Sequence, residues 1–123
     1  MIIIKTDNAP KAIGPYSQAI VSDRVIYTSG QIAIKPESGN VEATTIEEQT
    51  EQICKNIKEL LLAAGSSIEK VVKTTCFLAN MEDFAAFNSV YEQYFVSKPA
   101  RSSVAVKELP KNVLVEIDTI AEV

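Results

Sequence analysis

The amino-acid sequence predicts an α+β fold with the element order β-β-β-α-β-α-β-β, in which two helices cover one face of a mixed or antiparallel sheet. Two segments, residues 46–64 and 84–95, repeat apolar side chains at helical spacing. Runs rich in β-branched residues precede the first helix, separate the two helices and close the chain. The length of 123 residues, without an internal linker or low-complexity segment, fits a single domain spanning residues 1–123.

The first part of the chain is expected to form short strands separated by turns. These strands cover residues 2–5, 19–21 and 24–29, and the third resumes at residues 31–34. A loop follows the first strand at residues 8–15, because two prolines and a glycine there oppose regular structure. Gly30 interrupts the third run, and a turn cluster at residues 36–40 follows its continuation.

The first helix has recognisable start and end signals. Thr45 and Glu48 have the spacing of an N-terminal capping box, and Gly65 lies where a C-terminal cap belongs. The apolar positions of this helix are Ile46, Ile53, Ile57, Leu60, Leu61 and Ala64. Most of its charged residues fall on the opposite side, which is the pattern of a helix face exposed to solvent.

The second half repeats the alternation of strand and helix. Residues 71–78 are predicted to form a strand, and Asn80 is placed to cap the helix that follows. The apolar positions of that helix are Phe84, Phe87, Val90, Tyr91, Tyr94 and Phe95. Helical spacing alone explains this aromatic stripe, so we interpret it as core rather than as a cofactor site. Pro99 ends the segment, and two closing strands are expected at residues 102–107 and 113–121.

One face of the predicted sheet is left without helices. Several strands nevertheless carry apolar residues on both of their faces. Such a pattern indicates that the uncovered face is buried by other subunits.

Composition excludes several classes of function. The formal net charge of −4 argues against general affinity for nucleic acid, which depends on many lysine and arginine contacts to phosphate. The chain contains no histidine, so sites that rely on imidazole are excluded. Cys54 and Cys76 lack the spacing of a zinc site, and we expect both to be buried as small hydrophobic residues. Because no run resembles a signal peptide or a membrane span, we expect a cytoplasmic protein.

Two charged residues stand out against their surroundings. Arg101 opens a strand directly after Pro99-Ala100, and Glu116 lies among aliphatic residues in the last strand. A carboxylate in such a position is partly desolvated, which is costly without a partner. The residues alone leave three interpretations open: a structural Arg101–Glu116 pair, a glutamate on a solvated sheet face, or a functional site. Without histidine, base chemistry falls to carboxylates, tyrosine, lysine or the main chain.

A set of short motifs resembles the Rid (YjgF-like) family. The C-terminal motifs are Pro99-Ala100-Arg101-Ser102-Ser103-Val104, Leu109-Pro110 and Val115-Glu116-Ile117. The N-terminal motifs are Asn8-Ala9-Pro10, Ile13-Gly14-Pro15-Tyr16-Ser17-Gln18 and Thr28-Ser29-Gly30-Gln31. The middle section is matched by Val71-Val72-Lys73-Thr74-Thr75 and Asn88-Ser89-Val90-Tyr91. Several short motifs in the right order over nearly the whole chain make the resemblance specific, whereas one alone would be weak.

The resemblance implies a chorismate-mutase-like fold assembled as a homotrimer, with an active site in each cleft between subunits. The family hydrolyses small reactive 2-imino and enamino acids, such as 2-iminobutanoate, 2-iminopropanoate and 2-aminoacrylate, to 2-keto acids and ammonia, without a cofactor. By resemblance, Arg101 grips the substrate carboxylate and Glu116 orients and activates water. The further residues that would contact the ligand are Tyr16, Ser29, Gly30, Asn88 and Ser103, with Gly30 and Ser103 acting through the main chain. Position 103 is serine where many family members have cysteine.

The implied chemistry agrees with the residue types. A guanidinium can hold a planar carboxylate through two parallel hydrogen bonds. The iminium carbon is already electrophilic, so a placed water and a carboxylate base suffice for hydrolysis.

Two other functions remain open at this point. One is a regulatory module that binds small acids in the same pocket without catalysis, and the other is RNA cleavage, which has been proposed for some relatives. The acidic charge and the missing histidine argue against RNA cleavage. Without the family match, Tyr16 is equally explained as a loop aromatic over the core, and Ser29-Gly30 as a strand break.

Overall fold

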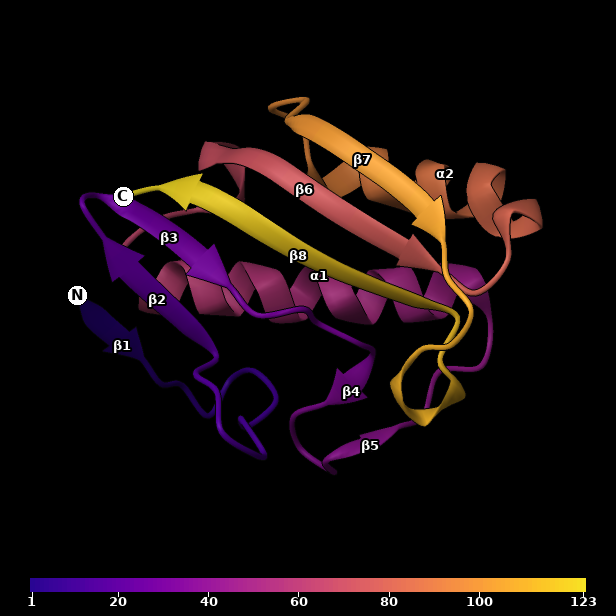
Figure 1. Cartoon of the computed structure of the whole chain (residues 1–123), viewed down its shortest axis with the longest axis horizontal. Helices are drawn as coiled ribbons and strands as arrows, with labels where there is room; N and C mark the ends of the chain where they lie inside the picture. Colours follow the sequence, from indigo (N-terminus) through magenta and orange to yellow (C-terminus); the bar gives the residue numbers. More distant parts are fainter.

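The sheet of the computed structural model, which describes residues 1–123, has six strands and is mixed. Its spatial order is β1 (Ile2–Ile4), β2 (Ala19–Ser22), β3 (Val25–Thr28), β8 (Val115–Glu122), β6 (Val71–Leu78) and β7 (Ala100–Ala105). Only β6 and β7 pair in parallel. The helices α1 (Ile46–Ala63) and α2 (Phe84–Tyr94) both lie behind the sheet in Figure 1. The predicted α+β class, with two helices on one face of a mixed sheet, is confirmed.

Both faces of the last strand have distinct roles, because side chains alternate along a strand. On β8, Val115, Ile117 and Ala121 are fully buried and belong to the core between sheet and helices. The helices fill that core with Ile53, Ile57 and Leu61 from α1 and Phe87, Tyr91 and Phe95 from the second helical segment. Glu116 alternates with the buried residues of β8 and therefore faces the side of the sheet that no helix covers.

The helix ends follow the predicted signals. The Thr45 hydroxyl accepts a hydrogen bond from the Glu48 main-chain N–H at 3.1 Å, which caps α1. Gly65, with a φ of 81°, follows the last turn of α1 in the left-handed conformation expected there. Asn80 caps a short 3₁₀ turn (Met81–Asp83) that leads into α2, because its side chain accepts from the Glu82 N–H at 2.9 Å. Cys54 and Cys76 are fully buried free thiols, as predicted.

Some boundaries differ from the prediction. Instead of a continuous strand at residues 31–34, Gln31 makes an isolated bridge to Ile117, and the hairpin β4 (Ile34–Lys35) and β5 (Asn40–Val41) follows as a separate sheet. The strand β7 begins two residues earlier than expected and ends at Ala105, because its parallel pairing with β6 starts directly after Pro99.

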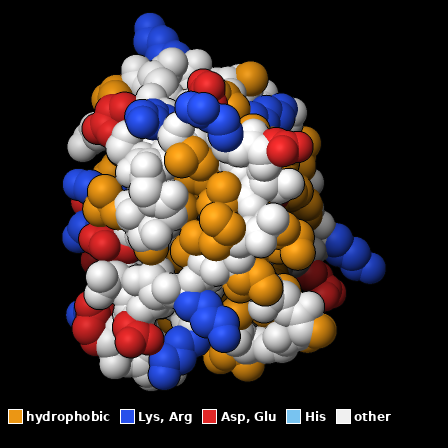
Figure 2. Space-filling model, turned by 90° about the vertical axis from the view of Figure 1, so that its left-hand side faces the viewer, with side chains coloured by type: hydrophobic (Ala, Val, Ile, Leu, Met, Phe, Trp, Pro, Cys, Tyr) orange, Lys and Arg blue, Asp and Glu red, His pale blue; other side chains and the backbone are white.

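The uncovered face of the sheet exposes large hydrophobic side chains. Tyr27, Val72 and Val104 are 48%, 43% and 46% exposed, although each lies within a strand. Figure 2 shows further hydrophobic side chains gathered down the face where the N-terminal strands lie, between lysine, arginine and carboxylate groups. Neither helix combines the length and apolar character that a membrane crossing would need.

The turn between β2 and β3 offers a test of local strain. Asp23 and Arg24 have φ values of 48° and 65°, so this two-residue turn holds two side chains in the left-handed region. We expect Arg24→Gly to raise the free energy of unfolding by about 0.5–1 kcal/mol, because glycine adopts this conformation without steric cost. Denaturant unfolding measures the difference, and Arg24→Ala, which keeps the strain, is the control. Equal stability of the glycine and alanine variants would contradict the expectation.

Candidate active site

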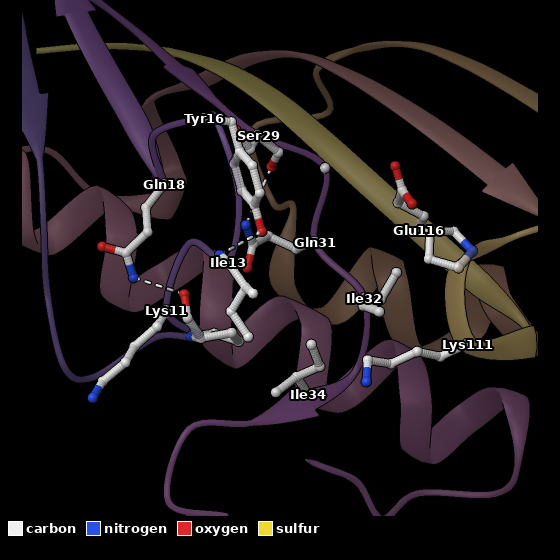
Figure 3. Close-up of a pocket in the computed structure, with 13 residues that line it drawn as sticks. Lys11, Ile13, Tyr16, Gln18, Ser29, Gln31, Ile32, Ile34, Lys111 and Glu116 are labelled. Atoms are coloured by element: carbon white, nitrogen blue, oxygen red, sulfur yellow. Dashed lines mark hydrogen bonds between the residues drawn. The ribbon is translucent and has the colours of Figure 1, made fainter. Parts of the chain in front are cut away.

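A cleft of about 570 Å³, here called the Glu116 cleft, gathers four of the seven residues expected to form the site. Figure 3 shows Tyr16 and Ser29 on one side of it and Glu116 on the other. The walls come from the loop before β2, the segment that follows β3, a turn before β8, and β8 itself. The lining residues are Pro10, Lys11, Ile13, Tyr16, Gln18, Ser29, Gly30, Gln31, Ile32, Ile34, Pro110, Lys111 and Glu116.

Glu116 is an unpaired carboxylate in this cleft. It is half-buried, and its side chain has no hydrogen bond or ion pair within the chain. Burial, and secondly the charge of Asp118 on the same face of β8, raises the pKa of the Glu116 carboxyl above its ordinary value. A raised pKa makes the carboxylate a stronger base, which suits it to accept a proton from water.

Gly30 leaves the space that Glu116 occupies. A Cβ atom at position 30 would lie 2.2 Å from Glu116 Oε2 and 3.2 Å from Cγ, both inside van der Waals contact. Glycine at this position therefore has a steric reason, because a side chain here would push the carboxylate away from the main chain.

The opposite wall is held by main-chain contacts. The Ser29 hydroxyl donates to the Ser17 carbonyl at 2.6 Å, and the Ser29 N–H donates to the Gln18 carbonyl at 3.0 Å. The Tyr16 hydroxyl accepts from the Ile13 N–H at 3.3 Å, while the side chain stays 52% exposed. Tyr16 therefore lines the cleft.

Arg101 lies in a second group of residues, which we call the Arg101 platform: Arg101, Asn88, Phe84 and Tyr91. Nη1 of Arg101 donates to Asn88 Oδ1 at 2.7 Å, and its guanidinium carbon lies 4.8 Å from the ring centroid of Tyr91 and 5.3 Å from that of Phe84. The Tyr91 ring is fixed in turn, because its hydroxyl is 2.7 Å from the Thr74 hydroxyl of β6. The guanidinium is thus oriented while its other N–H groups remain free.

No carboxylate pairs with Arg101. The single salt bridge within the chain joins Lys35 and Glu42, 3.8 Å apart. Arg101 pairs in register with the buried Thr74 and contacts α2, so it lies on the helix side of the sheet, whereas Glu116 lies on the other side. The structural Arg101–Glu116 pair that the sequence allowed is therefore wrong for the single chain. One ligand cannot contact both residues of the same copy.

Ser103 belongs with the Arg101 group. It lies two residues along β7 from Arg101 and pairs with the buried Cys76, so its side chain faces the helix side. Its hydroxyl oxygen is buried and has no hydrogen-bond partner. The structure thus divides the predicted site residues into Tyr16, Ser29, Gly30 and Glu116 in the cleft, and Asn88, Arg101 and Ser103 on the helix side.

Sequence reasoning missed the aromatic support of Arg101. Phe84 and Tyr91 were interpreted only as core. Phe84, Asn88 and Tyr91 occupy positions i, i+4 and i+7 and therefore share one face of α2. That spacing, next to an amide that can accept from an arginine, is the signal that was available. Lys111, which Figure 3 shows reaching along the cleft toward Ile34, was also not predicted as a lining residue.

The fold and these two groups define a small α+β protein with a cationic platform on one side of its sheet and a cleft that holds an unpaired carboxylate on the other. The family model described as Endoribonuclease L-PSP matches residues 6–123. A Lactococcus lactis protein named as the regulator AldR is 52% identical over 124 residues, covering 100% of this chain and 98% of the relative. The human 2-iminobutanoate/2-iminopropanoate deaminase is 48% identical over 120 residues, covering 97% of this chain and 88% of the relative.

A solved structure of a similar protein also matches the whole chain. The crystal structure of E. coli TdcF with bound serine matches with a TM-score of 0.95 at 38% identity, covering 100% of this chain and 99% of TdcF. The chain belongs to the Endoribonuclease L-PSP family, which is the Rid (YjgF-like) family that its motifs resemble. The chorismate-mutase-like fold expected from that resemblance is confirmed.

The contact between Gly30 and Glu116 predicts a large effect of one methyl group. We expect Gly30→Ala to lower, roughly 100-fold, the kcat/KM of any reaction in this cleft that uses the Glu116 carboxylate, because the Cβ atom displaces the carboxylate by more than an ångström. The melting temperature should change little, since the carboxylate can rotate toward solvent. In a Glu116→Ala background, the same substitution should cause no further loss of activity. Full activity of a folded Gly30→Ala protein would show that the carboxylate position is unimportant.

Proposed function

We propose that the protein hydrolyses small 2-imino and enamino acids, among them 2-iminobutanoate and 2-iminopropanoate, to 2-keto acids and ammonia. The observation that carries the proposal is the Arg101 platform, in which a guanidinium is held on two rings and an amide with no carboxylate partner. Such a group is prepared for the carboxylate of a ligand. The names of human, goat and mouse relatives at 48–50% identity support this substrate class.

The reaction needs few groups from the protein. Arg101 holds the substrate carboxylate, and a water molecule attacks the iminium carbon while Glu116 accepts a proton from that water. Protonated Glu116 returns that proton to the nitrogen of the carbinolamine, and the C–N bond breaks. Ammonia leaves as the carbonyl forms, and the hydroxyl proton passes through Glu116 to the ammonia, which departs as ammonium. Water supplies the oxygen, no electrons are exchanged, and no metal or cofactor enters the balance. Tyr16, Ser29 and the main chain at Gly30 would enclose the reacting end of the substrate.

We further propose that the site forms between copies in a homotrimer. Support comes from the placement of Arg101 and Glu116 on opposite sides of the sheet. Both residues can contact the same ligand only if one subunit supplies Arg101 and another supplies Glu116. The exposed Tyr27, Val72 and Val104 on the uncovered face supply apolar area for such an assembly. Sedimentation velocity tests this point, because a stable monomer with full activity would exclude a shared site.

A second candidate is a regulatory module that binds small acids without catalysis. Two relatives favour it, namely the protein named as the regulator AldR and TdcF, whose crystal structure holds serine. This module would use the same Arg101 platform to hold a carboxylate. It predicts binding of 2-ketobutyrate in calorimetry without any acceleration of imine decay.

An imine-trapping assay separates the two candidates. An amino-acid oxidase generates 2-iminobutanoate beside semicarbazide, and semicarbazone formation is followed with and without the protein. Suppressed trapping supports hydrolysis, since the imine is consumed before it is captured. Unchanged trapping over several imino acids, with a folded protein that binds 2-ketobutyrate, would exclude the deaminase and support the regulatory module.

A further inference from the structure

Few packing contacts fix the wall of the Glu116 cleft that contains Tyr16. Tyr16 borders the cleft on one side and a second cavity of about 300 Å³ on the other. Half of its side chain is exposed. Because open space lies on both sides of the ring, van der Waals contacts alone cannot fix its position.

The segment that carries Tyr16, here called loop 10–18, also has few internal bonds. Within it, the Tyr16 N–H donates to the Gly14 carbonyl at 2.9 Å, and the Ile13 N–H donates to the Tyr16 hydroxyl. Residues 5–18 take part in no strand pairing, because the β1–β2 pairing ends at Ile4 and Ala19. The position of the loop must therefore be set at its two ends.

One buried side chain joins those ends. Gln18 is 5% exposed, and its Oε1 accepts from the Thr6 N–H at 2.8 Å. Its Nε2 donates to the carbonyls of Thr6 at 3.0 Å, Pro10 at 2.7 Å and, more weakly, Ala9 at 3.4 Å. Figure 3 shows the bond that reaches the main chain beside Lys11, at the start of the loop. A single amide thus replaces a missing strand ladder and closes the loop.

The main chain of Gln18 extends the same connection to the reacting side of the cleft. Its carbonyl accepts from the Ser29 N–H, one residue beyond the last β2–β3 pair, Ala19 and Thr28. Gln18 therefore links the start of loop 10–18 through its side chain and the Ser29-Gly30 wall through its backbone. These bonds are buried or partly buried, where losing a partner costs most.

We propose that Gln18 is a positioning residue for the reaction of the Glu116 cleft: its amide closes loop 10–18 and holds Tyr16 in place over the ligand. The proposal rests on the proposed function for its kinetic consequence, but the clamping of the loop is a property of the fold itself. Gln18 lines the cleft, but it is only 5% exposed and its amide is occupied by the main chain of residues 6–10. It acts through Tyr16 and Ser29.

The test compares two buried glutamines. Gln49 is also 5% exposed and also ties main-chain segments together, since it donates to the Ala43 carbonyl at 3.1 Å and accepts from the Leu114 N–H at 2.9 Å. It does not line the Glu116 cleft. Gln18→Met and Gln49→Met each replace a buried amide by an apolar side chain of similar length. Both should lower the melting temperature, so stability alone does not distinguish them.

Two readouts distinguish a positioning role from a structural one. For Gln18→Met we expect KM for 2-iminobutanoate to rise about tenfold with kcat changed less than about threefold, because ligand binding loses Tyr16 while Glu116 is intact. Hydrogen–deuterium exchange of the Ile13 and Tyr16 amides, the two that donate within the loop, should accelerate at least about tenfold in this variant. Gln49→Met should leave both unchanged. A second variant, Thr6→Pro, removes the N–H that donates to Oε1 and also the hydroxyl that accepts from the Asn8 N–H, and should give intermediate exchange if Gln18→Met does not fold.

The outcomes separate this proposal from the proposed function. Unchanged exchange of loop 10–18 in Gln18→Met, or equal KM effects in the two glutamine variants, would overturn the positioning role. If wild-type protein shows no imine hydrolysis, the dissociation constant of 2-ketobutyrate replaces KM as the readout. Faster loop exchange with weaker binding of that acid would then support the role of Gln18 while the deaminase itself failed.

Discussion

Replacing Arg101 by alanine is expected to lower kcat/KM for 2-iminobutanoate by at least about 30-fold, which corresponds to the lower end of the roughly 2–5 kcal/mol lost when a buried charge pair is truncated. The substrate carboxylate would lose the guanidinium that Asn88, Phe84 and Tyr91 orient in the Arg101 platform. Arg101 is exposed and unpaired in the chain, so the fold should survive the change. Semicarbazide trapping and the melting temperature together measure the effect.

The chain offers a matched control for this substitution, since it has only one other arginine, Arg24. Arg24→Gly removes the same charge at the β2–β3 turn, away from the platform, and should retain activity. Arg101→Lys should recover only part of the activity, because an ammonium lacks the planar fork that matches a carboxylate. Normal turnover by folded Arg101→Ala would remove Arg101 from the proposed site.

Local signals in the sequence predicted the elements well. The cap at Thr45 and the left-handed Gly65 depend on contacts within a few residues, so pattern and structure agree. Asn80 also caps through a local contact, but it caps the 3₁₀ turn before α2 and not α2 itself. Strand alternation also survived, since Val115 and Ile117 are buried on either side of Glu116 along β8. These features need no knowledge of which strands are neighbours.

The arrangement of the site could not be predicted in the same way. Arg101 is level with Thr74, which is level with Thr119 on β8, and Glu116 lies three residues from Thr119. An odd separation places the two charged residues on opposite faces of the sheet. That outcome depends on two strand registers, which are set by long-range packing. The family motifs contained both residues but carried no information about this register.

The bonds of Gln18 were hidden for a similar reason. Its partners lie eight to twelve residues away in a segment without regular structure. The Arg101 platform could not be predicted because aromatic residues at helical spacing look the same in sequence whether they fill the core or support a cation. Phe87 and Phe95 form core, whereas Phe84 and Tyr91 also support a cation.

Substituting Glu116 by glutamine should separate catalysis from binding and from stability. We expect kcat to fall on the order of 100-fold or more, since the amide cannot accept the proton of water. KM, or the dissociation constant of 2-ketobutyrate, should change little because Arg101 is intact. In the wild type, kcat/KM should fall on the acid side as the carboxylate is protonated, at a pH above the ordinary pKa of glutamate. Asp118→Asn, which removes the neighbouring charge, should move this acid limb to lower pH while activity persists.

The same carboxylate should make the fold less stable at neutral pH. Because the pKa of Glu116 is raised in the folded chain, the folded state binds its proton more tightly than the unfolded state does. The free energy of unfolding therefore falls as pH rises from the ordinary pKa through the raised one, and the loss is complete above it. Glu116→Gln carries no such charge, so it should melt at a higher temperature than wild type at about pH 7 and lose that advantage below about pH 4. A glutamine variant that is inactive and more stable is the signature of a residue kept for chemistry. One that is inactive and less stable at neutral pH would instead indicate that Glu116 supports the fold.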